Sequence, residues 1–109
     1  MARFIEITIV DQLDEAFELS RTRTVALLKH SNSCGISAHT KYLLEELDAD
    51  IHVVTVQTHR ALSDEIARRT GHRHQSPQMF ILRDGAVVHH STHYAIDPAT
   101  VDSFLKPAA

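Results

Sequence analysis

The stretch "TVALLKHSNSCGIS", residues 24–37, carries the main fold signal of the chain and its only cysteine, Cys34. Residues 24–30 are a nearly continuous apolar run with a β-branched start, which is typical of a strand buried on both faces of a parallel sheet. A polar loop follows, and then apolar residues recur at helical spacing, namely Ile36, Thr40, Leu43, Leu44 and Leu47. A buried strand that leads into a helix predicts an α/β fold.

The rest of the chain alternates in the same way. Strand periodicity over residues 4–10 precedes a helical pattern that starts with Asp11 as its N-cap, and residues 51–57 are again strand-like before a helix over 59–71. Asp84-Gly85 between two apolar runs, 79–82 and 86–88, predicts a hairpin, and a last helix starts near Pro98. The predicted order is β-α-β-α-β-α-β-β-α, with a mixed sheet between two layers of helices.

Length and composition limit the classes of function. The 109 residues suit a single domain, residues 1–109, and 43% hydrophobic residues are enough for one ordinary core. The net charge of −3 and the scattering of the eleven Lys and Arg residues argue against nucleic acid as a partner. The start of the chain is too short and mixed for a signal peptide or a membrane span, and one cysteine allows no internal disulfide, so we expect a cytoplasmic protein with no membrane partner.

Cys34 lies where the buried strand ends and a helix begins. Free N–H groups and the positive end of the helix dipole favour a thiolate there, and Lys29 and His30 just upstream are expected to add positive potential. The alternative is that the thiol is a small buried hydrophobe, as most free cysteines are. Because the neighbouring loop is polar and built from small residues, we favour the hypothesis of a reactive thiol.

Cys34-Gly35-Ile36-Ser37 is a C-x-x-S sequence in the position of the C-x-x-C redox motif that follows a strand in the thioredoxin layout. Ser37 cannot close a disulfide with Cys34, so an external thiol must resolve any mixed disulfide, and Ser37 is expected to donate a hydrogen bond to the thiolate. The whole chain resembles the thioredoxin superfamily, and "CGIS" is similar to the C-G-F-S motif of monothiol glutaredoxins. The resemblance implies a thioredoxin-like three-layer α/β/α fold.

A second motif lies 43 residues further on. "QSPQMFILRDGAVV", residues 75–88, is similar to the thioredoxin segment in which a cis-proline precedes a β-hairpin. The resemblance implies that Pro77 is cis and faces the cysteine, and that the backbone of Ser76 pairs with the partner in the mixed disulfide. The alternative is an ordinary trans bond at the start of a strand, since cis X–Pro bonds are uncommon.

A closer resemblance spans nearly the full length. "KHSNSCGIS", "HQSPQ" and "DGAVVHHSTHY" resemble the monothiol bacilliredoxins, with Gly35 where that family more usually has proline and with Thr92 inserted in the third motif. The resemblance implies an oxidoreductase that removes a small thiol from S-thiolated client proteins. Bacillithiol or glutathione would be its transient cosubstrate, and no tightly bound cofactor or metal is expected. The implied catalytic residues are Cys34 and Ser37, and the implied substrate-binding residues are His30, Gly35, Ser76, Pro77, His93 and Tyr94.

His93 and Tyr94 follow the hairpin, in the segment that returns towards the cysteine in the thioredoxin layout. His93 would steady the thiolate or meet a carboxylate of the small thiol, and Tyr94 would wall the groove. In the alternative, Tyr94 packs on the last helix and His93 points to water. The other histidines do not have the spacing of a structural zinc site, and we interpret them as surface residues.

Two functions of other classes remain open from the sequence. One is a dimer that bridges an iron–sulfur cluster, as the glutaredoxins with C-G-F-S do. The other is an interaction module that keeps the thioredoxin shape without redox turnover.

Overall fold

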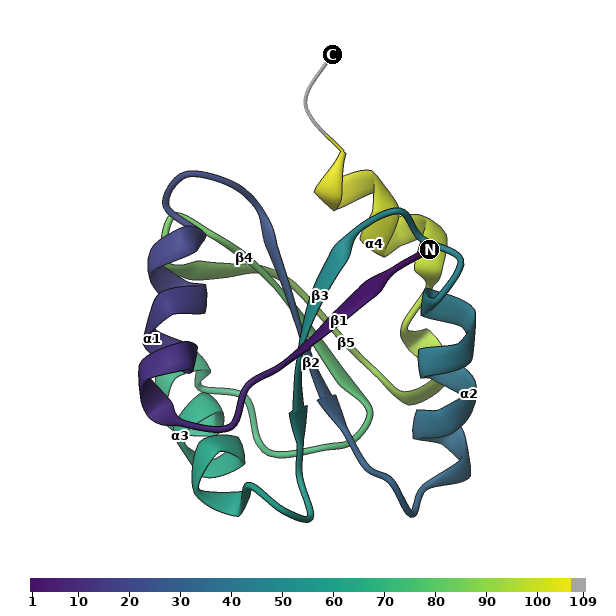
Figure 1. Ribbon diagram of the computed structural model, residues 1–109, viewed down its shortest axis with the longest axis horizontal. Helices are drawn as coiled ribbons and strands as arrows, with labels where there is room; N and C mark the ends of the chain where they lie inside the picture. The colour runs from purple at the N-terminus through teal and green to yellow at the C-terminus, as the bar shows by residue number, and fades with distance from the viewer. Residues whose placement is uncertain (107–109) are drawn as a thin grey trace.

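The computed structural model describes residues 1–106, which form one five-stranded sheet with helices on both faces (Figure 1). The sheet has the order β1-β3-β2-β4-β5, and its strands are β1 (Arg3–Glu6), β2 (Val25–His30), β3 (Asp50–Thr55), β4 (Gln78–Arg83) and β5 (Ala86–Thr92). The first three strands in this order are parallel, whereas β4 is antiparallel to both β2 and β5. The predicted mixed sheet and element order are confirmed. Residues 107–109 of the predicted domain lie outside the described residues.

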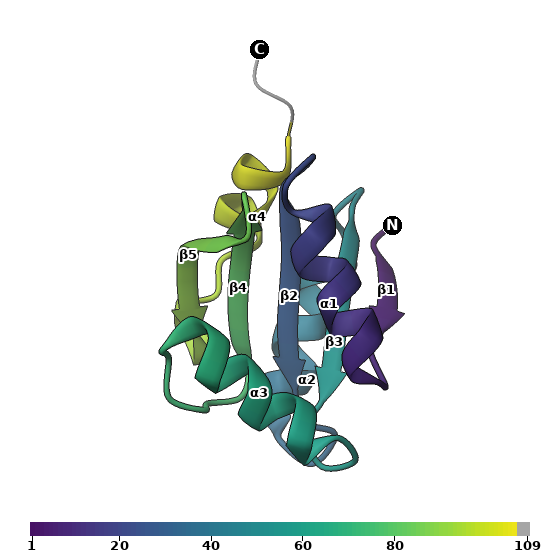
Figure 2. The same cartoon turned by 90° about the vertical axis from the view of Figure 1, so that its left-hand side faces the viewer.

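Two layers of helices enclose the sheet. Helices α1 (Val10–Leu19) and α3 (Arg60–Thr70) cover one face, and α2 (Gly35–Leu44) and α4 (Pro98–Leu105) cover the other (Figure 2). Successive side chains of β2 point into opposite cores, because residues alternate between the two faces of a strand. Val25 and Leu27 pack with α1 and α3, while Ala26 and Leu28 pack with α2 and α4. A strand covered on both faces explains why its sequence is apolar throughout.

The first strand is shorter than predicted, and Asp11 is not the N-cap of α1. Pairing with β3 ends near Glu6, and Ile9 is the N-cap, so that Asp11 lies in the first turn of the helix. The Thr8 N–H donates to Oε1 of Gln12 at 2.8 Å. This bond turns the chain into the helix, although the alternating sequence pattern continues to residue 10. As a result Ile9 is 54% exposed, although the sequence pattern placed it in a strand.

The predicted turn and helix end are confirmed. Asp84 and Gly85 both have positive φ, 54° and 77°, as a two-residue hairpin turn with the twist of the flanking strands requires. Gly71 ends α3 with φ 72°, in the left-handed conformation that glycine adopts without strain from a Cβ. The final helix begins at Pro98, and its N-cap Asp97 accepts the N–H of Ala99.

One charged side chain lies inside the sheet. Lys29 of β2 is fully buried on the α3 face, where its Nζ lies 3.4 Å from Nδ1 of His74, and His74 Nδ1 is also 3.1 Å from the Ser63 hydroxyl. Burial lowers the pKa of Lys29 to about 8, although the carboxylate of Asp64 acts in the opposite direction. The folded chain therefore releases this proton at a lower pH than the unfolded chain does.

This linkage predicts the effect of replacing Lys29 with methionine. Between pH 8 and the ordinary lysine pKa of 10.5, the unfolded chain holds a proton that the folded chain has lost, so wild-type stability rises with pH in that window. Below pH 8 the penalty is fully present, and Lys29→Met should raise the free energy of unfolding there by about 3 kcal/mol. Urea denaturation at pH 7 and pH 10 measures the difference.

Lys106→Met is the matched control, because the hydrogen bond that Lys106 donates to Asp102 raises the pKa of that exposed lysine. Its contribution to stability has the opposite sign and is lost only as the pH rises past the ordinary lysine pKa of 10.5, so it is not expected to grow between pH 7 and pH 10. An advantage of Lys29→Met that does not shrink between pH 7 and pH 10 would contradict the prediction.

Candidate functional site

Cys34 lies at the edge of the sheet where the parallel strands end. It is the N-cap of α2, with φ −108° and ψ 120°, and its side chain is partly exposed. Its carbonyl accepts the first helical hydrogen bond, from the Ala38 N–H at 3.1 Å. An N-cap leaves the next N–H groups of the helix without partners in the helix, so those donors are free to meet the sulfur.

Hydrogen bonds from the start of α2 make the thiol more acidic. The backbone N–H of Ser37, followed by the N–H of Ile36 and the Ser37 hydroxyl, lowers the pKa of Cys34 below its ordinary value. Partial burial acts in the opposite direction and is outweighed. Because the thiolate is the nucleophile, this arrangement favours thiol–disulfide exchange near neutral pH.

Ser37 contributes to the site from a fully buried position. Its Oγ accepts the Ser31 N–H at 3.3 Å, and the Ser37 hydroxyl is one of the groups that lower the pKa of Cys34. The serine thereby ties the helix to the loop in front of it, and its hydrogen bond to the thiolate stays a prediction. Gly35 beside it is exposed, and apart from its chain neighbours and the helix backbone a Cβ there would meet no atom within 4 Å, so there is open space next to the cysteine.

The expected help from Lys29 and His30 is not found. The side chain of Lys29 lies on the α3 face of the sheet, away from α2. Neither is among the groups that shift the pKa of Cys34. His30 is buried beneath the loop, and burial, with Lys41 nearby, lowers its own pKa and favours the neutral ring. Its Nδ1 has no hydrogen-bond partner within residues 1–106. Contact between His30 and a small thiol stays a prediction.

The second motif lies at the same edge of the sheet. β2 and β4 pair with Lys29 opposite Gln78, so one further step of the register places Pro77 beside His30, four residues before the cysteine. Pro77 is buried, Ser76 is half-buried, and the peptide bond between them is cis. The side chain of Gln78 holds this loop, because its Nε2 donates to the Arg73 carbonyl at 3.0 Å and its Oε1 accepts the Gln75 N–H.

The segment after the hairpin returns towards the cysteine, as expected. The His93 N–H donates to the Pro77 carbonyl at 3.0 Å, and the turn η1 (His93–Ala95) packs against α2. His93 has φ 52°, a left-handed conformation that costs a non-glycine residue about 1 kcal/mol. Tyr94 is 77% exposed, so it does not pack into the core beside the last helix. The structure thus brings Cys34, Ser37, the Pro77 loop and the His93 turn to one edge.

Sequence analysis missed one residue at this edge. Gln57 follows β3, and its side chain makes hydrogen bonds to Ser31, Asn32 and Ser33 in the cysteine loop. The available signal was weak, because Gln57 is a single polar residue after an apolar strand. Its position at the carboxyl end of a strand adjacent to β2 is what makes it noteworthy.

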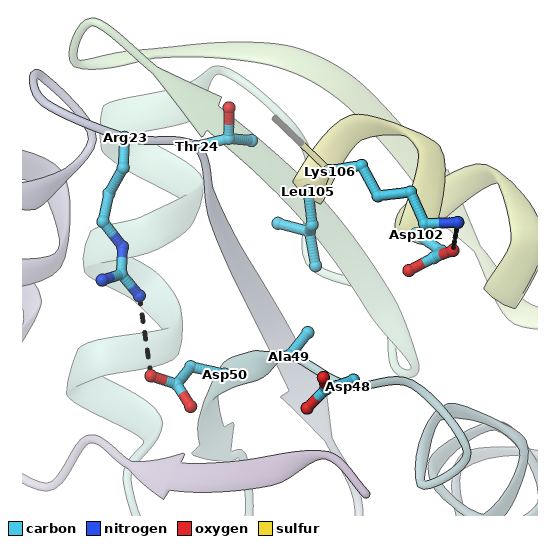
Figure 3. Close-up of a pocket in the computed structure, with 8 residues that line it drawn as sticks. All are labelled: Arg23, Thr24, Asp48, Ala49, Asp50, Asp102, Leu105 and Lys106. Carbon is cyan, nitrogen blue, oxygen red and sulfur yellow. Dashed lines mark ion pairs between the residues drawn. The ribbon is translucent and has the colours of Figure 1, made fainter. Parts of the chain in front are cut away.

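A hollow of about 440 Å³ lies at the opposite end of the sheet, where β2 and β3 begin (Figure 3). Two ion pairs line it, Arg23 with Asp50 at 3.5 Å and Lys106 with Asp102 at 2.8 Å. Its position away from the sulfur means that it supplies no group to thiol chemistry. Within residues 1–106, no cluster of three His, Cys, Asp or Glu side chains is arranged to hold a metal ion, and none of the helices is long and apolar enough to cross a bilayer.

Comparison with known proteins agrees with this geometry. The family model of monothiol bacilliredoxin BrxC matches residues 5–101, which include the cysteine loop, the proline loop and the His93 turn. The chain belongs to the monothiol bacilliredoxin family. The family match and the solved structures support a thiol redox role for the bacilliredoxin chain.

Similar solved structures share the thioredoxin fold. A protein described as a candidate oxidoreductase with a thioredoxin fold is 33% identical, with a TM-score of 0.82 and 94% of each chain covered. Thioredoxin from Malassezia sympodialis is 14% identical, with a TM-score of 0.72 over 94% of this chain and 88% of that one. Spinach chloroplast thioredoxin f is 18% identical, with a TM-score of 0.67 over 94% and 90%. The last two likenesses concern the fold alone.

Replacing Ser37 with alanine should raise the pKa of Cys34, because one of the three donors to the thiolate is removed. At a pH below the thiol pKa, the rate of alkylation by iodoacetamide should fall about two- to tenfold. The pH profile of alkylation measures both effects. Ser103→Ala is the control, since that hydroxyl donates to the Thr100 carbonyl on α4, far from the site. An unchanged profile in Ser37→Ala would show that the hydroxyl does not act on the sulfur.

Proposed function

We propose that this bacilliredoxin is a monothiol thiol–disulfide oxidoreductase that removes a low-molecular-weight thiol, bacillithiol in the first instance, from protein mixed disulfides. The observation that carries the proposal is the free, partly exposed Cys34 at the N-cap of α2, where the first turn of the helix lowers the pKa of the thiol. Ser37 stands in the position of the second cysteine of a dithiol site, and it cannot form a disulfide with Cys34.

The reaction has two exchange steps. The Cys34 thiolate attacks the small-thiol sulfur of the mixed disulfide, so that a new S–S bond forms on Cys34 and the client cysteine leaves as a thiolate that takes up a proton. A second small thiol, as its thiolate, then attacks the small-thiol sulfur on Cys34. The two small-thiol molecules leave together as the symmetric disulfide, and the Cys34 thiolate is regenerated. The client sulfur is reduced and the incoming small thiol is oxidised to the same extent, while the first small-thiol sulfur stays in a disulfide throughout, so the electrons balance.

The surrounding residues support this assignment in different ways. We assign the backbone of Ser76 and the Pro77 loop to binding the extended part of the mixed disulfide. The open space at Gly35 leaves room for the incoming sulfur. His93 and Tyr94 are assigned to the wall of the groove, because the η1 turn is fixed to both the Pro77 carbonyl and α2. His30 is assigned to support the loop from beneath.

Intact mass after incubation with a symmetric small-thiol disulfide tests the proposal. We expect the wild type to gain one small-thiol mass with oxidised bacillithiol, and excess reduced bacillithiol to remove it. Cys34→Ser should gain nothing, and parallel incubation with oxidised glutathione shows which small thiol is preferred. Absence of the adduct in the wild type, or an adduct that reduced small thiol does not remove, would rule out the proposed cycle.

A further inference from the structure

We propose that Gln57, which follows β3, is a positioning residue that holds the Cys34 loop in the conformation in which the sulfur reacts. The inference deepens the proposed function and rests on it in so far as Cys34 is the reacting group. Gln57 itself contacts the loop and not the sulfur, so it acts through other residues.

One side chain meets three consecutive residues of the loop. The Gln57 Nε2 donates to Oγ of Ser31 at 2.6 Å and to Oγ of Ser33 at 2.8 Å, and its Oε1 accepts the Asn32 N–H at 3.1 Å. Both ends of the amide are therefore engaged. A lysine or an aspartate would not serve in the same way, because the first lacks an acceptor and the second lacks a donor.

The loop has little else to fix it. Asn32 and Ser33 are exposed, so no apolar packing anchors them. The Cys34 N–H reaches the Ser31 carbonyl only at 3.5 Å, at the long end of the hydrogen-bond range. Ordering a loop costs conformational entropy, which hydrogen bonds within the folded chain partly offset. Three bonds from one side chain therefore make a large part of what orders this short loop.

A chain of contacts connects Gln57 to the sulfur. Ser31 accepts from Gln57 with its hydroxyl and donates its backbone N–H to Oγ of Ser37, and Ser37 is the residue that lowers the pKa of Cys34 most. The segment that carries Gln57 is fixed to the end of β2, because the Val56 N–H donates to the His30 carbonyl at 2.9 Å. Gln57 therefore links the cysteine loop, which follows β2, to the end of β3.

The test is the pH profile of iodoacetamide alkylation in Gln57→Leu, which keeps the size of the side chain and removes all three hydrogen bonds. We expect the profile to shift to higher pH and the rate at pH 7 to fall about three- to tenfold. Ser33→Ala removes one of the three bonds and should produce a smaller shift in the same direction. Circular dichroism and thermal unfolding establish that both variants are folded.

Gln12→Leu is the matched control. Gln12 also holds a loop through its side chain, since its Oε1 accepts the Thr8 N–H at 2.8 Å and the Thr8 hydroxyl at 3.2 Å, but it lies on α1. Its loss should affect stability and leave the alkylation profile at the wild-type position. A folded Gln57→Leu with the wild-type profile would overturn the inference, and so would an equal shift in Gln12→Leu.

The two proposals fail separately in these experiments. Alkylation by iodoacetamide requires neither a small thiol nor a client protein. If the wild type forms the small-thiol adduct and Gln57→Leu has the wild-type profile, only the role of Gln57 is wrong. If the wild type forms no adduct, the proposed cycle is wrong whatever Gln57 does to the thiol.

Discussion

The site depends on the first turn of α2, which lowers the pKa of the Cys34 thiol. The backbone N–H groups of Ser37 and Ile36 have no partner within the helix, and they lower this pKa from the helix end at which Cys34 is the N-cap. A thiol with these donors ionises more readily than a free one, and ionisation is what makes it a nucleophile. The role of the surrounding protein is to keep the cysteine at that N-cap while leaving one side of the sulfur open.

The central strand provides this arrangement. β2 is buried on both faces, and its end is held by β3 on one side and β4 on the other. The antiparallel register with β4 sets the Pro77 loop next to the end of β2, and the parallel register with β3 sets Gln57 on the other side. Three loops that are far apart in the sequence therefore meet because of strand pairing. The small thiol and the client would meet the sulfur between them.

Much of this was accessible from the sequence, for physical reasons that differ between elements. The apolar run at 24–30 and the turn at Asp84-Gly85 are local signals, and the strands and hairpin follow from them. The C-x-x-S sequence located the sulfur and its serine partner. The end of β1 was not predictable in this way. The alternation of apolar and polar residues continues beyond Glu6, where pairing with β3 stops.

The contacts that cross between elements were beyond sequence analysis. Proximity in sequence suggested that Lys29 and His30 act on Cys34, but the Lys29 side chain lies on the α3 face of the sheet, and burial lowers the pKa of His30 and favours its neutral ring. Gln57 is 23 residues from the cysteine and contacts its loop only through the register of β3 with β2. A residue that belongs to no sequence motif can be assigned to the site only once the strand pairing of the fold is known.

One measurement tests the dependence of the site on α2 most directly. The ultraviolet absorbance of the Cys34 thiolate can be titrated in the native chain and in the same chain unfolded in urea, where helix donors are absent. Since the chain has one cysteine, the signal belongs to a single sulfur. The expected result is a lower pKa in the native chain than in the unfolded one. A native pKa equal to or above the unfolded value would show that the helix does not stabilise the thiolate, and would contradict the central claim.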